Sequence, residues 1–138
     1  CFYTDQYTAR QWGEPSTGNG FRPGLTRAPF PSLVNWCVQP GVLDDAELLR
    51  QLDTGLVVDQ VLGGGADISG DFAVNVDLGY WVQGGQVQGR VKDTMIAGNV
   101  YDILQRDVVL GGQATWQGDT LTPGLIVQGI TITSKTNS

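Results

Sequence analysis

The sequence predicts an α+β fold in which most strands pair in an antiparallel sheet and two segments form helices. The 20 glycines among 138 residues are about twice the usual share of roughly 7%, which is typical of short strands joined by tight turns. Between residues 56 and 91 the apolar residues recur with a period of two, as in half-buried strands. Residues 44–53 instead have helical spacing. The length suits one domain, so residues 1–138 are expected to form a single domain.

The first forty residues predict short elements around a loop. Residues 2–12, FYTDQYTARQW, favour a strand that turns into a short helix. The following stretch, GEPSTGNGFRPG, is rich in Gly, Pro, Ser and Asn, and its Thr17-Gly18-Asn19-Gly20 run can supply positive φ angles. Residues 32–41, SLVNWCVQPG, are expected to form a strand that Pro40-Gly41 ends.

The clearest helix is DDAELLRQLD at 44–53. Asp44 suits the N-cap, and Gly55 stands where a C′ glycine is expected. The apolar side of this helix consists of Ala46, Leu48, Leu49 and Leu52.

Consecutive antiparallel strands are predicted next: LVVDQVL, DISGDFAVNVDLGYWV and QVQGRV. The glycine runs 63–65 and 84–85 provide the turns between them. Phe72, Val74 and Val76 alternate with polar or small residues, as in a strand with one buried face.

A second helix is predicted over residues 94–105, followed by a strand at 107–112, a polar loop at 113–124 and a last strand at 125–133. This helix would contain Gly98-Asn99, although glycine inside a helix costs about 1 kcal/mol relative to alanine. Such a glycine indicates a close approach, either of a neighbouring strand or of a bound chain.

Composition excludes several classes of function. A chain without histidine cannot use Ser-His-Asp or Cys-His catalysis or a His-ligated metal. The net charge of −6 argues against nucleic acid, which needs a basic face. No apolar run approaches the ~18 residues of a membrane span. Two cysteines, Cys1 and Cys37, are too few for a disulfide framework, and a cytoplasmic location is expected.

Asp53-Thr54-Gly55 matches the triplet that aspartic peptidases carry. In those enzymes two carboxylates share one proton, so a single triplet in this chain would need a homodimer. The peptidase triplet follows a strand, whereas the preceding residues AELLRQL have helical spacing. The alternative interpretation is that Asp53 ends a helix and Gly55 caps it.

Four stretches in order resemble the C-terminal domain of the TldD/PmbA family, bacterial and archaeal peptidases once described as modulators of DNA gyrase. They read YTARQWGEPSTGNGFRP, LVNWCVQPGVLDDAELLRQLDTGLVVDQV, SGDFAVNVDLGYWVQGGQVQGRVKDTMIAGNVYDILQ and TPGLIVQGITIT. The resemblance covers nearly the whole chain. Its most specific part is Gly70-Asp71-Phe72, followed by a Gly-Gly turn and the AGN segment.

The resemblance implies a zinc peptidase whose metal lies outside this chain. In the peptidase members, an N-terminal domain bears His-Glu-x-x-x-His, in which the histidines bind zinc and the glutamate activates water. A further ligand is a cysteine in the loop before the final strand, but residues 111–124 contain none. We therefore assign no metal ligand and no catalytic residue here, and neither Cys1 nor Cys37 is a convincing substitute. Zinc is expected in the full-length protein or a partner subunit.

The start CFYTDQYTARQW, without an initiator Met, predicts a fragment of a longer protein, with a processed protein as the alternative; by the resemblance, the missing part is the N-terminal domain. It is expected to help form a substrate chamber and subunit contacts in proteolysis or maturation of small or unfolded peptides, as part of a homodimer or heterodimer. The parent is either an active peptidase or a non-catalytic TldE/PmbA-like companion; a purely assembly or binding module is the alternative. The sheet is expected to be strongly curved and barrel-like. Candidates for the substrate side are Thr17, Gly18, Asn19, Asp71, Phe72, Gly98 and Asn99.

Overall fold

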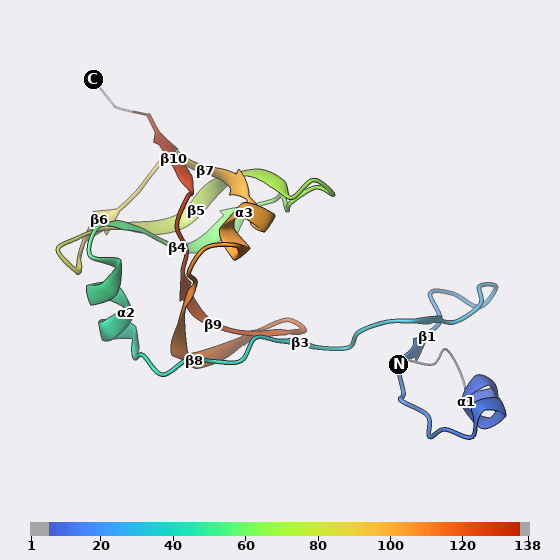
Figure 1. Cartoon of the computed structure of the whole chain (residues 1–138). Coiled ribbons are helices and arrows are strands. Elements are labelled where there is room, and N and C mark those ends of the chain that lie inside the picture. The colour runs from blue at the N-terminus through green and yellow to red at the C-terminus, as the bar shows by residue number, and fades with distance from the viewer. Residues whose placement is uncertain (1–5, 136–138) are drawn as a thin grey trace. The chain divides into compact units, whose positions relative to one another are not determined.

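The computed structural model describes residues 6–135, which fall into two compact units (Figure 1). The first unit comprises the chain up to Val38 together with Trp116–Leu121, and the second comprises Gln39–Thr115 and the chain from Thr122 onward. Most elements belong to one unit, whereas strands β8 (Val109–Gln117) and β9 (Thr120–Ile126) contribute residues to both.

The first unit contains one helix and short strands. Helix α1, Gln6–Trp12, buries Ala9. Strands β1, Gly20–Phe21, and β2, Phe30–Pro31, form an antiparallel pair. The short helix expected within residues 2–12 is thus confirmed, whereas the strand expected before it lies largely outside the described residues.

Strand β3, Trp36–Cys37, pairs in parallel with the start of β9. Of the strand predicted over residues 32–41, only these two residues form a strand. Both of its residues are exposed, so no buried face extends the strand further.

In the second unit, α2 spans Asp45–Leu52 and confirms the first predicted helix. Its start has both bonds of a capping box. Asp44 Oδ1 accepts from the Glu47 backbone N–H at 2.7 Å, and Glu47 Oε2 accepts from the Asp44 N–H at 2.9 Å. The helix ends at Asp53, which has φ +53°, so Gly55 is not the cap; it begins the next strand. Because the triplet 53–55 follows a helix, it does not match the aspartic peptidase arrangement.

A five-stranded sheet forms the main part of the second unit. Its strands are β4 (Gly55–Leu62), β5 (Asp71–Gln83), β6 (Gln86–Arg90), β7 (Thr94–Asn99) and β10 (Thr131–Ser134). The path runs β10-β7-β5-β4, with every pair antiparallel, and β6 also pairs with β5. The three strands predicted from period-two alternation are confirmed as β4, β5 and β6.

Strand β5 is long enough for two strands to share one of its edges. β7 pairs with its first residues, 71–75, and β6 pairs with its last, 80–83. Between these two registers, Gly79 O accepts a hydrogen bond from Val91 N at 2.9 Å. The sheet therefore forks where β6 and β7 separate.

The core of this unit is small. Val74 and Val76 of β5 are buried, as their alternation predicts, together with Val82 and Ile103. Val82 is the one large side chain of the described residues that is fully buried. Much of the remaining apolar surface stays exposed.

Val82→Ala is expected to lower the free energy of unfolding by about 2 kcal/mol, because it removes two methyl groups and leaves a cavity. Urea denaturation measures this difference. The matched control is Val87→Ala on β6, whose side chain is 52% exposed, and it should change stability by less than about 0.5 kcal/mol. Equal losses in both variants would contradict the assignment of Val82 to the core.

Residues predicted as a polar loop at 113–124 instead form most of a strand pair. β8 is Val109–Gln117, β9 is Thr120–Ile126, and the sheet order is β3-β9-β8. The tight turn at Gly118, φ +63°, closes the pair. The predicted last strand, 125–133, is also divided, because β9 ends at Ile126 and β10 begins at Thr131.

The helix predicted over residues 94–105 is wrong in its first half. Residues 94–99 are strand β7, and only Val100–Leu104 form a helix, α3. Pairing with both β5 and β10 decides this segment, since hydrogen bonds to two neighbours outweigh a weak local helix preference. Gly98-Asn99 therefore marks the junction between strand and helix.

The expectation of a strongly curved, barrel-like sheet is also wrong. The described residues form three sheets of two, five and three strands, and none of them is closed or strongly curled. A barrel needs its outermost strands to pair with one another, but β4 and β10 stand at opposite ends of the five-stranded path. The α+β class itself is confirmed, with three helices in place of two among the described residues.

Candidate functional site

Four of the predicted substrate-side residues meet at one corner of the five-stranded sheet. Asp71 of β5 pairs with Asn99 of β7, and Phe72 pairs with Gly98. The corner thus joins residues from the start of one strand and the end of another. Thr17, Gly18 and Asn19 belong to the first unit.

The side chain of Asn99 holds the corner together. Its Nδ2 donates to Asp71 Oδ1 at 2.8 Å and to the Ser69 carbonyl at 2.9 Å. Its Oδ1 accepts from the backbone N–H of Tyr101 at 2.9 Å and so caps α3. One amide therefore joins strand β5, the loop before it and the helix after β7, which explains why asparagine follows Gly98.

The loop before β5 is organised by Asp67. Its Oδ1 accepts from Ser69 Oγ at 2.6 Å, from Ser69 N at 2.9 Å and from Asp71 N at 3.1 Å. The bond from the Ser69 hydroxyl, aided by these backbone bonds, lowers the pKa of the exposed Asp67 carboxyl. Ser69 Oγ also lies 2.8 Å from Asp71 Oδ2, so the two exposed carboxylates flank one hydroxyl.

Gly70 is required at the corner. It has φ +87°, and a Cβ there would lie 2.5 Å from Cδ2 of the Tyr101 ring. Its carbonyl accepts from Val100 N at 2.8 Å. The Tyr101 hydroxyl donates to the Ile68 carbonyl at 3.3 Å, so the ring closes over the glycine.

Gly98 makes the close approach that its position in the sequence predicts. A Cβ at Gly98 would lie 3.2 Å from Cζ of Phe72 and 3.3 Å from Cδ1 of Ile130. Of the two alternatives left open, contact with a neighbouring strand accounts for the glycine, because the Phe72 ring comes from β5.

The other three predicted residues form the base of the β1–β2 hairpin. Gly18 has φ +69° in open space, which confirms that this loop uses positive φ angles. Asn19 Nδ2 donates to the Ser32 carbonyl at 3.1 Å, and Ser32 N donates to the Asn19 carbonyl at 2.9 Å. Thr17 lies two residues before Asn19, whose hydrogen bonds with Ser32 join the two ends of the hairpin.

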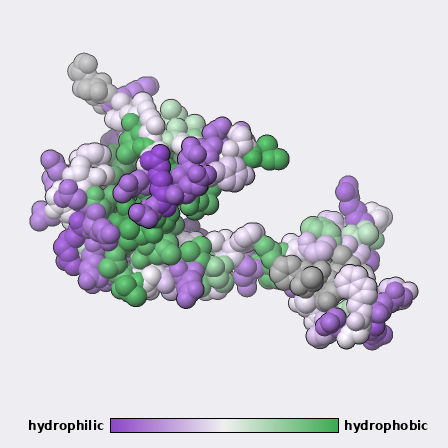
Figure 2. Space-filling view, viewed as in Figure 1, coloured by the Kyte–Doolittle hydropathy of each residue, from purple (hydrophilic) through white to green (hydrophobic). Residues whose placement is uncertain are grey.

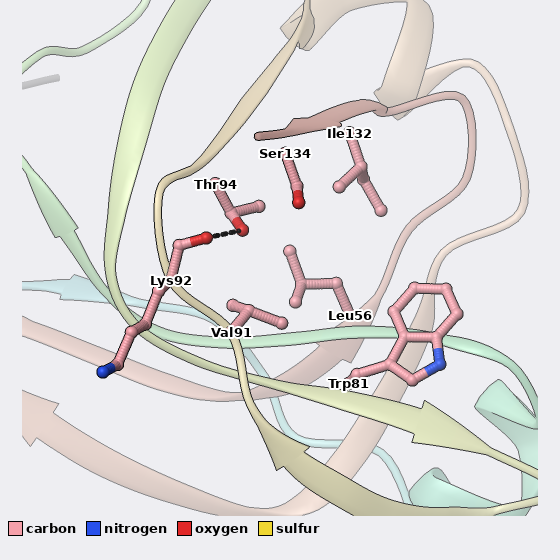
Figure 3. A pocket seen from close by; sticks show the side chains of 7 residues that line it. All are labelled: Leu56, Trp81, Val91, Lys92, Thr94, Ile132 and Ser134. Atoms are coloured by element: carbon pink, nitrogen blue, oxygen red, sulfur yellow. Dashed lines mark hydrogen bonds between the residues drawn. The ribbon is translucent and has the colours of Figure 1, made fainter. Parts of the chain in front are cut away.

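A recess that the sequence does not indicate lies where β6 and β7 separate (Figure 3). Its volume is about 360 Å³. The Thr94 hydroxyl donates to the Lys92 carbonyl at 2.9 Å, and the Lys92 ammonium points away from the recess (Figure 3). The lining residues are Leu56, Trp81, Val91, Lys92, Thr94, Ile132 and Ser134. They come from four strands and a linker, so no local pattern could have predicted the recess.

No zinc site is found among the residues that the structure describes. It has no histidine, and among residues 6–135 no three Asp, Glu or Cys side chains are grouped as metal ligands. Cys37 is exposed on β3, and Cys1 lies outside the described residues. A zinc ion of the kind found in peptidases needs three or four such ligands, and residues 6–135 do not bring such a set together.

Known proteins are similar in sequence to most of this chain. The profile of the PmbA/TldA metallopeptidase C-terminal domain matches residues 1–134. The chain belongs to the PmbA/TldD family. It is 30% identical over 129 residues to the metalloprotease PmbA of Escherichia coli O157:H7, an alignment that covers 89% of this chain and 26% of the relative. A zinc metalloprotease TldD homolog of Saccharolobus solfataricus is 25% identical over 103 residues, 75% of this chain and 23% of that protein.

Solved structures share the fold of this PmbA/TldD domain. A Thermotoga maritima protein described as a modulator of a DNA gyrase is 34% identical, with a TM-score of 0.71 over 94% of this chain and 29% of that one. TldE of Thermococcus kodakarensis is 26% identical, with a TM-score of 0.72 over 93% of this chain and 30% of that one. The chain spans about a quarter of the length of the curated relatives it matches.

Two surface properties of the domain bear on its role. Figure 2 shows a patch of hydrophobic side chains on the second unit, bordered by hydrophilic ones. Large apolar side chains exposed on this unit include Leu62, Ile68, Val87, Tyr101 and Leu104. In the part of the chain from residue 6 to residue 135, no helix has the length and hydropathy to cross a membrane.

Proposed function

We propose that this domain forms part of the substrate side of a PmbA/TldD-type peptidase that cleaves small or unfolded peptides, including peptides matured after ribosomal synthesis. The observation that carries the proposal is the Asp71–Asn99 pair. Asn99 fixes the orientation of an exposed carboxylate at a sheet corner, where it is available to accept hydrogen bonds from a peptide backbone or a cationic side chain. A carboxylate on a flexible loop would not be held in one orientation in this way.

An extended peptide is the substrate class that suits this fold. Among the described residues, β4 and β10 each pair with one strand only, so each leaves a row of backbone groups free on its outer side. A peptide can add to such an edge by main-chain hydrogen bonds, which are independent of its sequence. Thr17, Gly18 and Asn19, which belong to the first unit, are also proposed as substrate-side residues.

The zinc is proposed to be held outside this chain, either upstream in the same protein or on a partner subunit. This proposal is supported by the absence of histidine from the sequence and by the lack of a grouped ligand set among residues 6–135. The domain would then shape the substrate path and contribute to subunit contacts in a cytoplasmic homodimer or heterodimer, with residues 1–138 acting as one domain.

A non-catalytic companion subunit or assembly module is the second candidate. The similarity to TldE and the exposed apolar patch of the second unit favour it, because large exposed apolar patches mark interaction sites. In that case the same domain supplies an interface, and peptide turnover depends on a zinc-bearing partner.

Asp71→Asn in the full-length protein is expected to lower kcat/KM for an unstructured peptide about tenfold, which corresponds to about 1.4 kcal/mol. The substitution keeps the oxygen that accepts from Asn99 but removes the charge, so the melting temperature should stay nearly unchanged. Asp77→Asn, an exposed carboxylate on the same strand, is the matched control and should leave turnover intact. Unchanged turnover in the Asp71 variant would rule out the substrate-side role.

Zinc content of the full-length protein, measured by elemental mass spectrometry, separates the two candidate functions. About one zinc per chain supports the peptidase, with the metal held upstream. Zinc absent from this protein but present in a co-purifying partner supports the companion subunit.

A further inference from the structure

The β1–β2 hairpin carries the most exposed apolar side chain among the described residues of the first unit. Leu25, at the tip, is 95% exposed, and Phe21 and Phe30 in the strands are 40% and 49% exposed. The ends of the hairpin are tied by the bonds between Asn19 and Ser32, and Arg27 N donates to the Gly24 carbonyl at 3.2 Å within the loop. A two-stranded ribbon on its own is marginally stable in water, so contact with another surface would stabilise this element.

The hairpin is also the cationic part of an acidic chain. Residues 15–43 contain Arg22 and Arg27 and no Asp or Glu. The rest of the chain therefore holds all fourteen acidic side chains against six basic ones, a net charge of −8. Arg22 and Arg27, on either side of Leu25, are exposed, and arginine is enriched at protein interfaces.

We propose that the tip of this hairpin, Arg22 to Arg27, is a subunit contact that docks on the acidic surface of a second copy of the protein. The inference rests on the subunit pairing proposed above and names the element that makes it. Leu25 buries its side chain in the partner's apolar surface, while the two arginines face carboxylates around it. The partner's excess of carboxylates provides the charge complementarity, which speeds association and orients the two copies.

The same contact made twice closes a symmetric dimer. When the hairpin of each copy meets the acidic surface of the other, residue i of one copy contacts residue j of its partner and the reverse also holds. Exposed charge pairs contribute little each, so most of the affinity comes from Leu25 and the aromatic side chains beside it.

The test measures the dimer dissociation constant of the full-length protein by sedimentation at low and high salt. Arg22→Glu with Arg27→Glu is expected to raise the constant at least about tenfold, equal to about 1.4 kcal/mol, and Leu25→Ser to raise it similarly. Salt should weaken the wild-type dimer and have little effect on the double variant. Arg10→Glu in α1, an exposed arginine of the same unit, is the matched control and should leave the constant unchanged.

Three results would overturn the proposal. Unchanged dissociation constants in the hairpin variants would place the subunit contact elsewhere while leaving the proposed pairing intact. A lower melting temperature with an unchanged constant would assign the hairpin to a surface within its own chain. A wild-type protein that is monomeric at all concentrations would remove the proposed pairing as well. Neither of the last two results bears on the peptide turnover of the Asp71 variant.

Discussion

Asn99→Ala is expected to lower the free energy of unfolding by about 2–3 kcal/mol, the largest effect of any polar substitution in the domain. The change removes two donated hydrogen bonds, to Asp71 and to the Ser69 carbonyl, and the cap of α3. A lost helix cap costs about 1 kcal/mol, and each net hydrogen bond contributes about 1 kcal/mol. Chemical denaturation followed by circular dichroism measures the loss.

Two further variants separate the cap from the corner. Asn99→Asp retains an oxygen for the cap but replaces the Nδ2 donor with a carboxylate oxygen beside Asp71, so it should keep the cap, lose the corner bonds and add repulsion between the two carboxylates. Asn75→Ala, on an exposed position of the same sheet, should be nearly neutral. A loss at Asn99→Ala no greater than at Asn75→Ala would contradict the assignment of Asn99 as the residue that joins β5, the Asp67 loop and α3.

Gly70→Ala is expected to lower the free energy of unfolding by about 2–4 kcal/mol. The positive φ of Gly70 costs an L-residue about 1–2 kcal/mol, and the new Cβ would lie 2.5 Å from the Tyr101 ring and 3.0 Å from Asn99 Oδ1. Moving the ring would also break its hydroxyl bond to Ile68. Thermal unfolding of the variant should show the loss as a lower melting temperature.

The chain offers a control for the backbone part of this effect. Gly63 has φ +61°, and a Cβ at this position would have no neighbouring atom within 4 Å, so Gly63→Ala should show the conformational cost alone. Combining Gly70→Ala with Tyr101→Ala completes a double-mutant cycle, in which relief of the ring contact appears as a favourable coupling. Additive losses would mean that the ring is not what restricts position 70.

Helix α2 and the strands β4 to β6 could be predicted because their signals are local. A capping box, apolar residues at helical spacing and a period of two each act over a few residues. The triplet Asp53-Thr54-Gly55 is resolved by the same local signals, since AELLRQL forms a helix before it.

Strand β7 could not be predicted in this way, because its conformation depends on residues far along the chain. Met95 and Ala97 suit a helix, but they pair with Asn75 and Ala73 of β5. The local signal is Gly98-Asn99. In the sequence it suggests a break within a helix, whereas in the structure it ends strand β7, and Asn99 caps the helix α3 that follows. The hairpin of β8 and β9 could not be predicted for a related reason. Its polar residues are mostly exposed, so its sequence lacks the alternation of apolar and polar residues from which a strand is recognised.

Part of the candidate site could be predicted from the sequence. Asp71, Phe72, Gly98 and Asn99 are predicted together, and strand pairing does place them side by side. The roles of Asp67, Ser69 and Tyr101 are not predicted, although Asp-x-Ser-Gly-Asp is a pattern in which side chains bond to the nearby backbone. The recess beside Trp81 depends on how β6 and β7 separate, which no segment encodes alone.

The arrangement of strands around β5 also sets an order of assembly. β4, β5, β6 and β7 follow one another along the chain, so their pairings close shorter loops than the pairing of β7 with β10 and can form earlier. β10 pairs with β7 roughly thirty residues after it, and the entropy of closing that longer loop delays its docking. During synthesis the last strand leaves the ribosome after its neighbours, and until it arrives β7 is an unprotected edge on which another nascent chain can add.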